Sequence, residues 1–75
     1  MEIKGLIGET AGQVWHLLNS SGPQTLPQIK RKLDGTAPFL EFAVGWLVRE
    51  EKVDIDMEKK TYRLRLIYRR RARLG

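Results

Sequence analysis

The 75-residue sequence predicts a single α+β domain in which three helices precede a β-hairpin. Two observations lead to this prediction. Apolar residues recur at helical spacing in three segments before Lys52, and turn-forming residues separate these segments. After Lys52 the period changes to two, which is typical of strands with one buried face. A chain of this length forms one domain, near the lower size limit for independent folding.

The first helix is expected near residues 8–20, after a short apolar lead that contains Ile3 and Leu6. Its apolar positions follow the amphipathic spacing: Ala11, Val14, Trp15 and Leu18. Glu9 falls in the predicted first turn, where the helix dipole favours an acid. The turn formers, glycine and proline of residues 19–23 then end the helix.

The second helix is expected near residues 26–34, because Thr25-Leu26-Pro27-Gln28 matches a capping box. In this motif the Thr25 hydroxyl accepts a first-turn N–H and the Gln28 side chain accepts the N–H of Thr25. The spacing points the apolar residues inward and the cations outward: Leu26, Ile29 and Leu33 against Lys30, Arg31 and Lys32. A short strand around Gln24–Leu26 is expected to pair with the hairpin.

The third helix is expected near residues 37–51, with Thr36 as its cap and Pro38 in its first turn. One apolar stripe consists of Leu40, Ala43, Val44 and Leu47. A second, which we call the aromatic stripe, consists of Phe39, Phe42 and Trp46 and is turned well away from the first. A helix with two apolar faces needs two surfaces to pack against. The aromatic stripe is therefore either core, covered by the apolar lead of the chain, or an interface.

The hairpin is expected to have strands near 53–57 and 62–67. A register can be predicted that pairs apolar residues on one face: Met57 with Tyr62, Ile55 with Leu64 and Val53 with Leu66. The same register pairs opposite charges on the other face: Asp56 with Arg63 and Asp54 with Arg65. No Asn-Gly or Asp-Gly is present for a two-residue turn, so Glu58-Lys59-Lys60-Thr61 is predicted as a four-residue loop.

This order of elements is that of a winged helix-turn-helix, with the hairpin as the wing. Ile7–Trp15 (IGETAGQVW) and Val44–Val53 (VGWLVREEKV) resemble two signature stretches of a family of small prokaryotic winged helix-turn-helix proteins of unknown function. The resemblance covers roughly residues 5–66, and it implies a winged-helix fold, a homodimer and no known catalytic activity. The chain departs from the family pattern in an Arg-rich extension after Leu66.

Charge divides the chain into a domain of residues 1–67 and a tail of residues 68–75. The net charge is +5 and four arginines lie in the tail, so that residues 1–67 carry only +1. These four are Arg69, Arg70, Arg71 and Arg73. Such a tail either binds a polyanion without reading sequence or keeps the protein soluble. No signal peptide and no membrane-length apolar run is visible, which favours a cytoplasmic protein.

The side chains needed for enzyme and metal chemistry are scarce. There is no cysteine, and His16 is the single histidine, interpreted as a surface or boundary residue. A disulfide, a metal site and a hydrolytic triad are therefore not expected, and no glycine loop for phosphate is present. We expect no enzyme activity, no cofactor and no small-molecule substrate. Small domains that lack disulfides and metals are often stabilised by oligomerisation, so a homodimer is predicted. The alternative is a monomer whose own core is sufficient for folding.

Two functional hypotheses remain. In the first, the domain binds DNA or RNA through phosphate contacts, from cations that otherwise form a solvated surface: Lys30, Arg31, Lys32, Lys59, Lys60, Arg69, Arg70, Arg71 and Arg73. Sequence reading is expected to be weak, because base edges are read mainly by Arg, Lys, Asn and Gln, whereas Glu41 is the one charged or amide side chain between Ala37 and Val48.

In the second hypothesis, the chain is a homodimerising interaction module on a winged-helix scaffold. The predicted interface is the aromatic stripe together with Gly45, in the middle of the third helix. A mid-helix glycine costs about 1 kcal/mol relative to alanine, so its presence indicates a close approach at that point. The approaching element is either the partner subunit or an internal neighbour such as the first helix with Trp15.

Overall fold

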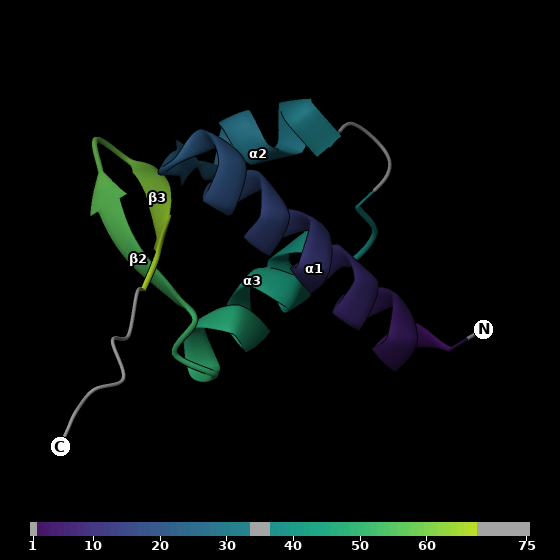
Figure 1. Cartoon of the computed structure of the whole chain (residues 1–75). Coiled ribbons are helices and arrows are strands. Elements are labelled where there is room, and N and C mark those ends of the chain that lie inside the picture. The colour runs from purple at the N-terminus through teal and green to yellow at the C-terminus, as the bar shows by residue number, and fades with distance from the viewer. Residues whose placement is uncertain (1, 34–36, 68–75) are drawn as a thin grey trace, which may run out of the picture.

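The computed structural model describes residues 2–33 and 37–67, and Figure 1 shows their arrangement. The elements are α1 (Ile3–Ser21), β1 (Gln24–Thr25), α2 (Leu26–Leu33), α3 (Leu40–Arg49), β2 (Val53–Glu58) and β3 (Thr61–Leu66). The strands form an antiparallel sheet in the order β1-β3-β2. The predicted α+β winged helix-turn-helix, with three helices followed by a hairpin wing and a short strand at Gln24, is confirmed.

The core lies where α1, α3 and the base of the wing meet. Every residue of the predicted inward stripe of α3 is buried: Leu40, Ala43, Val44 and Leu47. The other elements contribute further buried apolar residues: Ala11, Val14, Leu18, Ile29, Val53, Leu64 and Leu66. Trp15 is only half-buried and packs at the edge of this cluster. Helical periodicity was therefore sufficient to identify the core face of each helix.

The prediction for the start of α1 was wrong. The helix begins at Ile3, and the N–H of Leu6 donates to the carbonyl of Glu2 at 3.2 Å. Ile3 and Leu6 are therefore in the first turns of α1 and not in a separate lead, and Glu9 is no longer a first-turn residue. The helix includes Gly5 and Gly8, because glycine is tolerated inside a helix when the rest of the segment packs.

The predicted capping box of α2 is confirmed. The Thr25 N–H donates to Gln28 Oε1 at 2.8 Å, and the Gln28 N–H donates to Thr25 Oγ1 at 3.3 Å. Thr25 also pairs with Arg63 in the sheet. The start of α2 is thus fixed next to the wing, with Ile29 buried and the cations of its last turn exposed.

The prediction of residues 37–51 for α3 was too long at both ends, and the cap predicted at Thr36 lies outside the described residues. Phe39 adopts a left-handed conformation, with φ 57°, so the helix begins only at Leu40. At the other end Glu51 is left-handed, with φ 61°, and the N–H of Lys52 donates to the Leu47 carbonyl at 3.0 Å. This is a Schellman ending, which uses residues 50–52 as the cap instead of as further helix.

The predicted register of the wing is confirmed at all five pairs, and Glu58 also pairs with Thr61. The prediction of a four-residue loop was therefore wrong, because the turn consists of Lys59 and Lys60 alone. Both are left-handed, with φ 47° and 68°, as the two central residues of a type I′ turn must be. The turn forms although neither residue is the Asn or Gly that favours this conformation.

Candidate nucleic-acid interface

The tip of the wing carries two adjacent cations. Lys59 and Lys60 are exposed, and neither forms an ion pair within the part of the chain that the structure describes. The type I′ turn places them at the end of a two-stranded arm that extends away from the helices (Figure 1). Two unpaired ammonium groups at such a tip are suited to contact phosphates.

The outer face of the wing is different, because its cations are paired. Arg65 Nη2 lies 2.9 Å from Asp54 Oδ2, and Arg65 Nε lies 3.9 Å from Asp56 Oδ2. Arg63 lies 3.9 Å from Glu58. The positive potential of the wing is therefore concentrated at its tip.

The predicted cations of α2 occupy its last turn. Arg31 and Lys32 are exposed, whereas Lys30 Nζ lies 3.0 Å from Glu41 Oε2 on α3. The hydrogen bond from Lys30, with its charge, lowers the pKa of Glu41 below the ordinary value. Figure 1 shows this turn at the opposite end of α2 from the wing, so the two cationic groups are separated. Cations also stabilise a helix C-terminus, which gives Arg31 and Lys32 a structural role as well.

The outward face of α3 presents the aromatic stripe. Phe42 is 63% exposed and Trp46 is 47% exposed, while Phe39 is half-buried. The rings of Phe39 and Phe42 stack, with centroids 6.0 Å apart and planes inclined by 5°. The alternative that these rings belong to the core, covered by the start of the chain, was therefore wrong for Phe42 and Trp46.

Gly45 lies next to Phe42 and Trp46 on the outward side of α3 and is exposed. A Cβ built at Gly45 would meet no atom within 4 Å outside its own helix backbone and its chain neighbours. The internal close approach, by α1 or Trp15, is thus excluded as the reason for this glycine. The predicted contact with a partner subunit stays a prediction.

Sequence reasoning missed a groove between α1 and α3. It encloses ≈ 350 Å³ and is lined by Gly8, Ala11, Gly12, Trp15, His16, Trp46, Leu47 and Lys52. A Cβ at Gly8 or at Gly12 would also meet nothing within 4 Å, so that the α1 wall is open to a ligand. The sequence signal was the spacing of Gly8, Gly12 and Trp15, which share one side of a helix.

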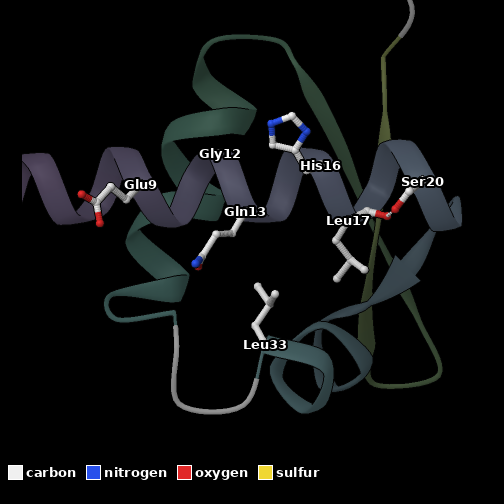
Figure 2. Close-up of a pocket in the computed structure, with 7 residues that line it drawn as sticks. All are labelled: Glu9, Gly12, Gln13, His16, Leu17, Ser20 and Leu33. Carbon is white, nitrogen blue, oxygen red and sulfur yellow. Dashed lines mark hydrogen bonds between the residues drawn. The ribbon is translucent and has the colours of Figure 1, made fainter.

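A second hollow, of ≈ 630 Å³, lies between α1 and the end of α2 (Figure 2). Leu17 and Leu33 point into the gap from the two helices, while His16 points away on the far side of α1. The polar side chains around it do not converge on one point. This hollow therefore offers no arrangement for catalysis, and His16 is exposed, as predicted.

The arginines predicted to bind polyanions, Arg69, Arg70, Arg71 and Arg73, lie outside the described residues. Among the residues that are described, each helix is too short or too polar to cross a bilayer.

The described part of the chain combines a cationic wing tip, a cationic turn on α2 and an exposed aromatic stripe on α3.

The chain is similar to a known family and to an archaeal protein. The family model described as Winged helix-turn-helix domain (DUF2582) matches residues 1–66. The uncharacterized protein MJ1608 of Methanocaldococcus jannaschii is 38% identical over 65 residues, which cover 83% of this chain and 91% of that protein. The archaeal relative is thus similar over nearly its whole length.

Proposed function

Since the chain belongs to the DUF2582 winged helix-turn-helix family, we propose that it binds nucleic acid, as a small regulator or an architectural factor, mainly through phosphate contacts. Winged helices place a helix and a wing against a duplex, so the scaffold itself favours this function. Fold alone does not fix function, and the proposal therefore depends on the chemistry of the wing.

The observation that carries the proposal is the pair Lys59-Lys60. A type I′ turn favours Asn-Gly, and each non-glycine residue in the left-handed region costs about 1 kcal/mol. Two lysines here lower the stability of the fold and place two unpaired charges at the most protruding point of the wing. Strain of this kind is concentrated at functional sites, and phosphate binding would explain it.

The other proposed contacts are Arg31 and Lys32 on α2, and the tail arginines. Lys30 contributes less, because Glu41 already compensates its charge. The exposed face of α3 presents aromatic rings where a reader of base edges would carry amides and guanidinium groups. Discrimination between duplex sequences is therefore proposed to be weak.

The salt dependence of binding to mixed-sequence DNA tests this proposal. Neutralising roughly five phosphates gives a slope of log affinity against log salt near −4 to −5. A chain truncated after Tyr68 should show a flatter slope, because it lacks four arginines. Arg65→Gln is the matched control, since Asp54 already pairs with this cation. Full-length protein that shows no binding at about 50 mM salt would exclude the proposal.

The second candidate is a homodimerising interaction module, and the exposed Phe42, Gly45 and Trp46 specifically support it. An exposed apolar patch of this kind commonly marks an interaction site. Sedimentation of the full chain should then give twice the mass of 8.7 kDa, and Phe42→Asp should return the monomer. A monomer at hundreds of micromolar would exclude this candidate.

A further inference from the structure

The aromatic stripe and the groove beside it have no role in the phosphate contacts proposed above. The stripe lies on the helix that would enter a duplex groove, yet its side chains are poor readers of paired bases. Aromatic rings recognise bases by stacking, which requires bases that are not already stacked in a duplex. The type of side chain therefore indicates a different form of nucleic acid.

The rings are arranged for stacking. The rings of Phe39 and Phe42 are parallel within 5°. Phe42 and Trp46 are one helical turn apart on the same exposed face, about 6 Å along the axis. Trp46 then continues into the groove between α1 and α3, where Trp15 lies on the other wall.

The groove is large enough for a small ligand. Its volume of ≈ 350 Å³ is at the lower end of the range for small-ligand sites. Ala11 and Leu47 form an apolar floor, and Gly8 and Gly12 leave the α1 side without side chains. An unstacked base in this groove would lie against Trp15 and Trp46, above the apolar side chains of Ala11 and Leu47.

Cations are present at both ends of the stripe. Lys30 reaches the first turn of α3 through Glu41, while Arg49 and Lys52 lie at the other end. Glu50 and Glu51 are beside this second pair of cations and offset part of their charge. Binding here should accordingly depend more on the rings than on phosphate charge.

We infer that the α3 face binds single-stranded nucleic acid, with unpaired bases stacked on Phe42 and Trp46 and one base in the groove between Trp15 and Trp46. This inference rests on the proposed function and names its substrate class. Every base has a π-face, so binding should tolerate sequence. It also explains why the outward face of α3 carries rings in place of amides and guanidinium groups.

Fluorescence anisotropy with labelled 12-nucleotide strands tests the inference, with a 12-base-pair duplex measured in parallel. Wild-type protein should bind the single strands more tightly than the duplex. Phe42→Leu and Trp46→Leu keep an apolar side chain but remove the ring, and each should weaken single-strand binding about tenfold. Trp46→Phe should retain most of the affinity, because it keeps a ring. Ile3→Ala is the control, since Ile3 is 47% exposed, like Trp46, but lies on the first turn of α1.

The strands oligo(dU) and oligo(rU) differ only in the 2′-hydroxyl. The strand that the protein binds with the higher affinity identifies DNA or RNA as the preferred ligand, and either result supports the inference. The protein could bind both strands and the duplex with affinities that Phe42→Leu and Trp46→Leu leave unchanged. This result would overturn the inference and leave the proposed function intact. Absence of binding to every strand and to the duplex would overturn both.

A second copy of the chain is the competing occupant of this face. Sedimentation of the same samples separates the two outcomes. A dimer that Phe42→Asp dissociates, while single-strand affinity stays unchanged, would assign the face to the second copy and overturn the inference. A monomer that binds single strands through the rings supports it.

Discussion

Lys30 Nζ lies 3.0 Å from Glu41 Oε2, so an ion pair joins the last turn of α2 to the first turn of α3. Both side chains are more than half exposed, and a surface pair of this kind contributes about 0–1 kcal/mol to stability. Its larger effect is on charge, because it compensates the one acid on the outward face of α3. The helix-turn-helix is thereby less negative where a nucleic acid would approach.

Lys30→Met should raise the pKa of Glu41 toward its ordinary value, because the hydrogen bond and charge from Lys30 lower it. A depressed pKa in the folded state stabilises the fold above the unfolded pKa, and this stabilisation is lost as pH falls through the folded pKa. Carbon-detected NMR titration of the Glu41 carboxyl measures the shift. Lys32→Met is the control and should leave the titration unchanged; an unchanged titration in Lys30→Met would contradict the pairing.

Thr10→Val should destabilise the fold by about 1 kcal/mol, because it removes a hydrogen-bond donor without changing the side-chain shape. Thr10 is buried, and its Oγ1 donates to the Pro38 carbonyl at 2.8 Å, which fastens the turn before α3 to α1. Denaturant unfolding measures the loss. Ser20→Ala removes an exposed hydrogen bond of 3.3 Å from the same helix and should change stability by less than about 0.5 kcal/mol.

Most of the fold followed from the sequence, because period and capping are local signals. The capping box at Thr25 and the pairing of Asp54 with Arg65 depend on residues close in sequence or in register, and both were predicted. The left-handed residues Phe39 and Lys60 could not be predicted, since tertiary packing or function sets these conformations against local preference. The predicted ends of α3 and the predicted loop of the wing were wrong for this reason.

The candidate site was predicted less completely. The exposed position of the aromatic stripe was one of two alternatives, and helical periodicity alone could not choose between them. The groove between Trp15 and Trp46 was missed, because it joins helices about thirty residues apart in the chain, and the spacing of Gly8, Gly12 and Trp15 marks only its α1 wall. Lys52 belongs to this groove and was not among the predicted site residues.

Gly45→Ala should stabilise the monomer by about 0.5–1 kcal/mol, because alanine is the better helix former and its Cβ meets no atom within 4 Å. Denaturant unfolding at a concentration where sedimentation shows a monomer measures this gain. Gly22→Ala is the contrasting variant, since Gly22 has φ 80° and alanine there is strained. If Gly45→Ala instead weakens a dimer, a partner backbone approaches this glycine, and the second candidate function gains support.

The wing tip allows strain and charge to be separated. Lys59→Asn/Lys60→Gly installs the dipeptide that a type I′ turn favours, and it should raise the free energy of unfolding by about 1–2 kcal/mol. Lys59→Gln/Lys60→Gln keeps two non-glycine residues at positive φ, so its stability should stay near that of the wild type. Denaturant unfolding of the two double variants measures this difference.

Both double variants remove the same two charges from the tip. If these lysines contact phosphates, each variant should flatten the log–log salt slope of DNA binding by about 1.8, because each phosphate contact contributes about 0.9. The more stable Asn-Gly variant should therefore bind no better than the Gln variant, which excludes loss of folding as the cause. A slope that stays at the wild-type value in both would mean that the wing tip does not contact phosphates, and the strain at Lys59 and Lys60 would need another explanation.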